Sequence, residues 1–164
     1  MLDQSPGDRR AVEPLLPLLR SRPGDLMVRL VVANTLGAIG DAHALPALLE
    51  VLRDDKETDK LRARVAYAIG LIGHPAAIDT LVELLHADPD IAIEAAHALG
   101  RISGPRAIGP LVGLLRDNNY ETTLAASHAL IWIGAQFFRC LKQWRRALAL
   151  RTASGHSSRL VVRT

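Results

Sequence analysis

Apolar residues recur along this chain at helical spacing. Ala11, Val12, Leu15 and Leu19 fall at positions i, i+1, i+4 and i+8, which places them on one face of a helix. The same apolar face returns three times. The aligned columns are Ala11, Ala44, Ala77 and Ala107; Val12, Leu45, Ile78 and Ile108; Leu15, Leu48, Leu81 and Leu111; and Leu19, Leu52, Leu85 and Leu115.

A second amphipathic segment precedes each copy, and a turn phrase that begins with Gly or Ser joins the two. The phrase starts at residues 7, 40, 73 and 103, so the steps are 33, 33 and 30 residues, and a further step of 31 reaches Gly134. Gly40 and Gly73 lie where the chain must turn, and Pro75 and Pro105 suit a first helical turn. The repeat therefore predicts helical hairpins, each with a helix A followed by a helix B.

The pattern predicts an all-α fold, a right-handed α-solenoid of stacked antiparallel helical hairpins. A hairpin of this kind cannot bury its apolar face alone, and its neighbours supply the missing partner. The expected units are a leading helix B at 8–20, hairpins at 22–54, 57–87 and 88–117, and a trailing helix A at 120–133.

The organisation predicted from this reading has four parts. Residues 1–6 form a disordered N-terminus, 7–134 the repeat solenoid, 135–150 a basic amphipathic capping helix, and 151–164 a disordered basic tail. After Gly134 the repeat pattern stops, but Phe137, Leu141, Trp144 and Leu148 still form an apolar stripe. Such a helix caps the open end of the stack or, alternatively, contacts a membrane surface or an acidic partner.

The phrase Val28-Arg29, followed by Ala33 and by Leu36-Gly37-Ala38-Ile39-Gly40-Asp41, resembles the short HEAT repeat of the phycobilisome-lyase type. The resemblance covers residues 7–134 and implies a helical-repeat fold that occurs in scaffolds, chromophore lyases and some metalloenzymes. Some copies depart from it. Ser103 replaces the second Gly of this phrase, the counterpart of Gly40, and Ile131 replaces the first, the counterpart of Gly37; both departures predict differently shaped turns. The motif Arg at 29 and 62 becomes Ala92 and Thr123 in the later copies.

Charge is distributed unevenly along the chain. The net charge is +3, but residues 1–121 carry 13 Lys and Arg against 17 Asp and Glu, a balance of −4, whereas residues 122–164 carry seven basic residues and no acid. The basic character thus belongs to the C-terminal end. Together with an aromatic content of 4%, this makes nucleic acid an unlikely partner of the repeats.

Features of secretion, membrane insertion and thiol chemistry are weak. The N-terminal residues lack a basic segment followed by an apolar one, and the longest apolar run, 129–135, is too short to span a bilayer. These features predict a cytoplasmic protein. The single cysteine, Cys140, has no partner for an internal disulfide and is interpreted as an incidental thiol.

Catalytic and metal-binding patterns are not recognisable. Deoxyhypusine hydroxylase, a HEAT-like di-iron enzyme, takes its ligands from His-Glu pairs early in helix A. The matching pairs here are Leu30-Val31, Ala63-Arg64, Ile93-Glu94 and Leu124-Ala125, which retain only Glu94. His97 and His128 share a column and should be neighbours, but two imidazoles do not make a zinc site. The sequence predicts no metal, no cofactor and no enzymatic activity.

Two columns of cations on helix B form a candidate partner-binding ridge: Arg20, Arg53, His86 and Arg116, with Arg10, His43 and Arg106 beside them. Cations in a last helical turn also stabilise their own helix through its dipole, so this alternative stays open. As a ridge on the concave face, they would engage an acidic segment of a partner.

The favoured function is a protein–protein interaction scaffold that presents a concave helical-repeat surface to a protein partner. An accessory subunit of a bilin lyase or related enzyme is the alternative, implied by the resemblance alone. The opening within a repeat and the break after Gly134 suggest a fragment, or an altered reading frame, of a longer solenoid.

Overall fold

The computed structural model describes residues 9–21, 25–116 and 119–153, with side chains described from residue 10 to residue 139. It divides into two compact units, residues 1–133 and 134–164. All regular secondary structure in the described residues is helical, and the first unit is an all-α solenoid, as the repeat pattern predicts. The predicted N-terminus at residues 1–6 lies outside the described residues, as do residues 154–164 of the predicted tail at 151–164. Residues 151–153 of that tail are helical, so the prediction of disorder is wrong for them.

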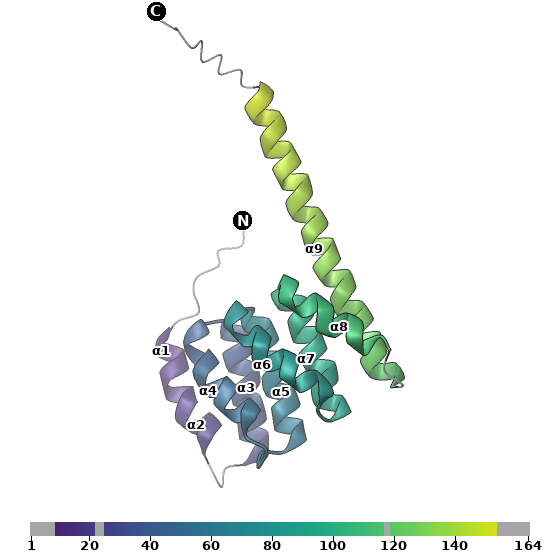
Figure 1. The fold of residues 1–164 in the computed structure, drawn as a ribbon. Helices are drawn as coiled ribbons and strands as arrows, with labels where there is room; N and C mark the ends of the chain where they lie inside the picture. Colours follow the sequence, from purple (N-terminus) through teal and green to yellow (C-terminus); the bar gives the residue numbers. More distant parts are fainter. Residues whose placement is uncertain (1–8, 22–24, 117–118, 154–164) are drawn as a thin grey trace, which may run out of the picture. The chain divides into compact units, whose positions relative to one another are not determined.

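The helices of the first unit form two layers, which we call the A layer and the B layer (Figure 1). The A layer holds α3 (Leu26–Ile39), α5 (Asp59–Ile72), α7 (Pro89–Ile102) and the first part of α9 (Tyr120–Ala153). The B layer holds α1 (Arg9–Val12), η1 (Glu13–Leu15), α2 (Leu16–Arg20), η2 (Ala42–Ala44), α4 (Leu45–Arg53), η3 (Pro75–Ala77), α6 (Ile78–Glu83), η4 (Leu84–His86), η5 (Pro105–Ala107) and α8 (Ile108–Leu114).

Each A-layer helix from α3 to α7 ends at a residue in the left-handed region. Gly40 and Gly73 have φ of 72° and 70°, as the turn phrase predicts. Ser103 replaces glycine at the third turn, yet it adopts the same conformation with φ of 56°, so the prediction of a differently shaped turn is wrong here. Its hydroxyl donates a hydrogen bond of 2.7 Å to the carbonyl of Gly100, which offsets part of the backbone strain.

A short 3-10 turn starts each B-layer helix after the turn. The side chain of Asp41 accepts a hydrogen bond from the backbone N–H of His43, and Nδ1 of His74 accepts one from Ala76. These side chains satisfy N–H groups that have no partner within their own helix. At the third turn Gly104 holds this position and no side chain caps η5, so the cap stabilises the first two turns and is not required for the third.

The chain does not turn at Gly134, and α9 continues past it. The prediction of a repeat turn at this position is wrong, because one helix runs from Tyr120 to Ala153 and includes the predicted capping segment 135–150. Ala135 follows Gly134, and alanine offers no capping side chain and favours helix. Among the described residues, neither α9 nor a shorter helix is both long and apolar enough to cross a bilayer.

The repeated leucine columns supply most of the core between the layers. Leu19, Leu52 and Leu85 are buried, and so are Leu48, Leu81 and Leu111. The fourth copy differs from the prediction, because Leu115 is 40% exposed and its neighbour Leu114 is buried in its place. The core position that the column alignment gives to Leu115 is therefore occupied by Leu114.

A glycine in each of three A-layer helices lies directly against an alanine of the next helix. A Cβ built on Gly37 would lie 2.8 Å from the Cα of Ala68. A Cβ built on Gly70 or Gly100 would lie equally close to the Cα of Ala98 or Ala129, respectively. Contacts below 3.0 Å are not tolerated by real Cβ atoms. Gly37 and its counterparts Gly70 and Gly100 therefore set how closely neighbouring helices approach, and they do not shape a turn.

Ile131 occupies the corresponding position of α9 and is 65% exposed. Its side chain fills the space that glycine leaves open in the other three copies. A further A-layer helix cannot approach α9 as closely as α9 approaches α7. The replacement of glycine by Ile131 was predicted to change the shape of a turn, but it lies at the position where the other copies pack against the next helix.

The glycine contacts predict opposite effects for two Gly→Ala substitutions. Gly70→Ala should lower the free energy of unfolding by about 1–3 kcal/mol, because the new methyl group collides with the backbone of α7. Gly113→Ala in α8 should raise it by up to about 1 kcal/mol, because nothing lies within 4 Å of its Cβ and alanine favours helix. Urea unfolding followed by circular dichroism measures both, and two shifts of the same sign would contradict this account of the packing.

Candidate functional site

The first predicted column of cations follows the ends of the B-layer helices. Arg20 ends α2 and pairs with Glu50 of α4 at 2.8 Å, and Arg53 ends α4 and donates a 2.6 Å hydrogen bond to the hydroxyl of Thr80. His86 ends η4, and Arg116 follows α8; both are exposed. Two members of this column thus connect consecutive repeats.

The second predicted column lies near the starts of the B-layer helices. Arg10 is in α1 and exposed, and His43 is 3.8 Å from the carboxylate of Asp41, two residues before it. Arg106 in η5 lies 3.8 Å from Asp79 of α6. These contacts give Arg20, Arg53 and Arg106 structural partners, so the ridge remains a prediction that competes with interhelical pairing.

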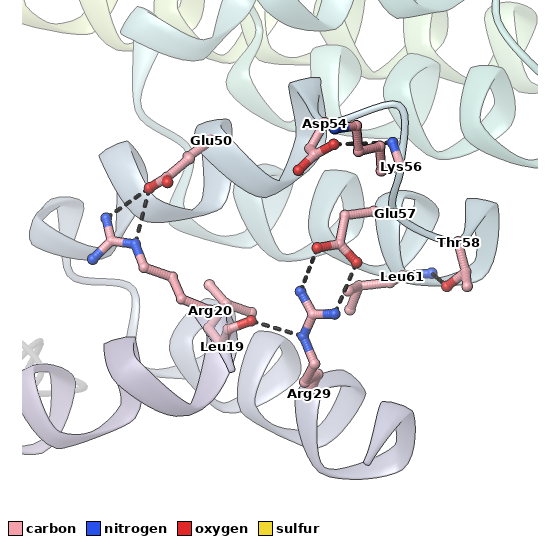
Figure 2. A network of polar contacts seen from close by, with 9 residues as sticks. All are labelled: Leu19, Arg20, Arg29, Glu50, Asp54, Lys56, Glu57, Thr58 and Leu61. Carbon is pink, nitrogen blue, oxygen red and sulfur yellow. Dashed lines mark hydrogen bonds and ion pairs between the residues drawn. The ribbon is translucent and has the colours of Figure 1, made fainter. Parts of the chain in front are cut away.

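The motif arginine of helix A has a different role from the cations of helix B. Figure 2 shows Arg29 between the end of α2 and the loop before α5. Its Nε donates to the carbonyl of Leu19 at 2.8 Å, and its two terminal nitrogens donate to the carboxylate of Glu57 at 2.8 and 2.7 Å. The guanidinium therefore satisfies a helix-end carbonyl and forms a bidentate ion pair, with both side chains less than 10% exposed.

The same clasp recurs one repeat later with more solvent. Nε of Arg62 donates to the carbonyl of Leu52 at 3.1 Å, and its charge faces Asp55 at 3.2 Å. In the fourth copy the hydroxyl of Thr123 donates to the carbonyl of Leu114 at 3.4 Å. The motif arginine thus holds the C-terminal end of the preceding helix B. The sequence around it does not reveal this role, because the carbonyl that accepts its hydrogen bond lies ten residues earlier in the chain.

A groove on the A layer offers a different environment. It has a volume of about 220 Å³ and is lined by six residues of α7 and α9: His97, Gly100, Arg101, His128, Ala129 and Trp132. The close contact of Gly100 with Ala129 forms its base. The imidazoles of His97 and His128 stack with centroids 6.5 Å apart and planes inclined by 15°, which confirms that this column brings them together.

Arg101 connects the groove to α5. Its Cζ lies 5.4 Å from the ring centroid of Tyr67 and 5.4 Å from that of Trp132. Tyr67 also contacts a second cation, because the Cζ of Arg64 lies 5.8 Å from its ring centroid. Cations within about 6 Å of an aromatic face are attracted by the ring quadrupole. Three consecutive A-layer helices thus hold an alternating series of cations and rings.

The groove is better suited to contact than to metal chemistry. In the described part of the chain, no group of three or more His, Cys, Asp and Glu side chains could hold a metal ion. The sequence places Tyr67 in the same column as the histidine pair, but it did not indicate Arg101 or Trp132. A usable signal was present, since Arg101 and Trp132 each follow a column histidine by four residues and so share its helical face.

Comparisons with known proteins agree with this architecture. A family model described as HEAT repeats matches residues 2–60 and 55–131. A solved engineered protein from the Northeast Structural Genomics Consortium is similar, with 28% identity, a TM-score of 0.59 and coverage of 75% of this chain. The match spans 62% of that engineered chain. No curated protein matches the sequence.

The two acid partners in Figure 2 predict unequal costs of removal. Glu57→Gln should lower the free energy of unfolding by about 3 kcal/mol, because it leaves the buried Arg29 without its counter-charge. Glu50→Gln should cost less than about 1 kcal/mol, because its pair with Arg20 is exposed. Urea unfolding of the two variants decides the matter, and equal losses would show that Arg29 does not depend on Glu57.

Proposed function

Since the chain belongs to the HEAT repeat family, we propose that it is a protein–protein interaction scaffold whose contact surface is the outer face of the A layer. Repeat solenoids of this kind bind partners along an extended surface that several repeats share. The proposal assigns contact to α3, α5, α7 and the first part of α9.

Exposed large apolar side chains carry this proposal. On α3, Met27 and Val31 are 61% and 60% exposed, and on α9 Trp132 is 50% exposed. The groove with its aromatic and cationic side chains lies on the same layer. Exposed apolar side chains on α3, and an exposed tryptophan beside an arginine at the groove, are residue types typical of protein interfaces.

Neighbouring helices contact one another through different residues in the two layers. Its helices meet through glycine and alanine, so their backbones lie close together. In the B layer, long side chains such as Arg20 with Glu50 and Arg106 with Asp79 bridge neighbouring helices. We therefore propose the A layer as the contact surface, and the concave face expected on helix B stays a prediction.

The assignment of the repeats to the phycobilisome-lyase type remains part of this proposal. The Val28-Arg29 phrase supports it, together with the clasp that Arg29 forms and the glycine that packs against the next helix. Among the described residues, no contact supports a role with a bilin.

A charge placed on the contact surface should abolish partner capture. Full-length protein immobilised in nuclease-treated extract of its native host should retain a protein partner at near-stoichiometric amount. Val31→Glu should lose that partner, because the substitution adds a charge to an exposed apolar position of α3. Val112→Glu, which changes a 44% exposed valine of the B layer, is the matched control and should retain it.

Quantitative mass spectrometry of the captured proteins, with circular dichroism as a check of folding, gives the readout. Loss of the partner by Val112→Glu and retention by Val31→Glu would assign contact to the B layer. Retention of no protein at near-stoichiometric amount would contradict the scaffold function.

A further inference from the structure

The charge of Arg101 is held in a different way from the arginines of the first unit that form ion pairs. Arg20, Arg29, Arg62 and Arg106 each face a carboxylate, at distances from 2.7 to 3.8 Å. Arg101 has no carboxylate partner in the described part of the chain, although it is half-buried. Its guanidinium is held instead by the rings of Tyr67 and Trp132.

This arrangement leaves the donors of Arg101 available in a fixed position. A guanidinium that lies over an aromatic face keeps its N–H groups at its edge, where they can bind a carboxylate through two parallel hydrogen bonds. Two rings from different helices restrict the side chain, so less conformational entropy is lost when an anion binds. The groove thus provides a preorganised site for an anionic group.

The size of the groove limits the occupant to one or two side chains. Its volume of about 220 Å³ falls below the roughly 300–1,000 Å³ typical of small-molecule sites. The histidine pair and Trp132 form a flat surface beside Arg101, which suits an apolar side chain. An extended peptide with a carboxylate next to an apolar residue matches both parts of the groove.

Charges along α7 favour one placement of the acidic group. Asp90 and Glu94 precede the groove along the helix, whereas Arg101 follows His97 by one turn. Residues 1–133 carry a net charge of −4, because residues 122–133 add no charge to the balance of residues 1–121. A polyanion such as nucleic acid is repelled by this net charge, whereas one carboxylate over Arg101 meets a local cation.

We propose that the groove between α7 and α9 binds an acidic, apolar peptide segment of a protein partner, with a Glu or Asp carboxylate on Arg101 and the adjoining apolar side chain against Trp132 and the histidine pair. This inference rests on the scaffold function and names the chemistry of the partner. It also places acidic recognition on the A layer, apart from the predicted ridge of helix B.

The test uses the full-length protein and two synthetic peptides. One is the acetylated and amidated sequence Gly-Leu-Glu-Leu-Gly, which carries one carboxylate, and the other has Gln in place of the Glu. Trp144→Phe leaves Trp132 as the single tryptophan, so its fluorescence reports occupation of the groove. We expect the acidic peptide to change Trp132 emission and to bind at least about tenfold more tightly than the Gln peptide, with an affinity that falls as salt rises.

Variants of single cations locate the site. Arg101→Gln should weaken binding of the acidic peptide about tenfold, because the bidentate partner is lost, and Arg101→Lys should recover only part of it. Arg106→Gln and Arg53→Gln, both in the B layer, are the matched controls and should leave affinity within about twofold. Circular dichroism establishes that every variant is folded.

Each other outcome overturns the inference. Equal binding of the two peptides, no binding of the acidic peptide, or no effect of Arg101→Gln would each remove it. A larger loss with Arg53→Gln would transfer acidic recognition to the ridge, and tighter binding of a single-stranded oligonucleotide would make the groove a nucleic-acid site. Continued capture of the native partner by the Arg101→Gln protein would leave the scaffold function intact while this inference fails.

Discussion

The contact of glycine with alanine between neighbouring A-layer helices is the constraint on which the rest of this fold depends. A methyl group at Gly37, Gly70 or Gly100 would collide with the next helix, so these positions set how closely the helices approach. The leucine columns of the core then fill the space between the two layers. Because each contact joins one repeat to the next, the solenoid is a chain of local interfaces.

The same close spacing creates the candidate site. Side chains that follow one another along the helix faces of α5, α7 and α9 are brought into contact across helices, which explains the stack of His97 on His128 and the position of Arg101 between two rings. In the B layer the long side chains of Arg20 and Arg53 are used to bridge repeats. The two layers therefore differ in which charges remain available to a partner.

The repeating part of the architecture could be predicted from the sequence because it is local. Glycine at 40 and 73, and leucine at fixed intervals, report backbone conformation and burial directly. The features that were missed depend on partners far away in the sequence. The clasp of Arg29 needs Leu19 and Glu57, and the array of Arg101 needs Tyr67 and Trp132. At Gly134 the pattern was misleading, since a glycine at the repeat interval does not by itself end a helix, and α9 continues to Ala153.

Native-state hydrogen exchange tests the central claim most directly. If contacts between neighbouring A-layer helices hold the stack together, the amides of α5 and α7, which have a repeat on both sides, should exchange most slowly. Protection should then decrease toward α1 and α2 on one side and along α9 on the other. Uniform protection of all helices in the first unit, or the slowest exchange in α1 and α2, would contradict the account.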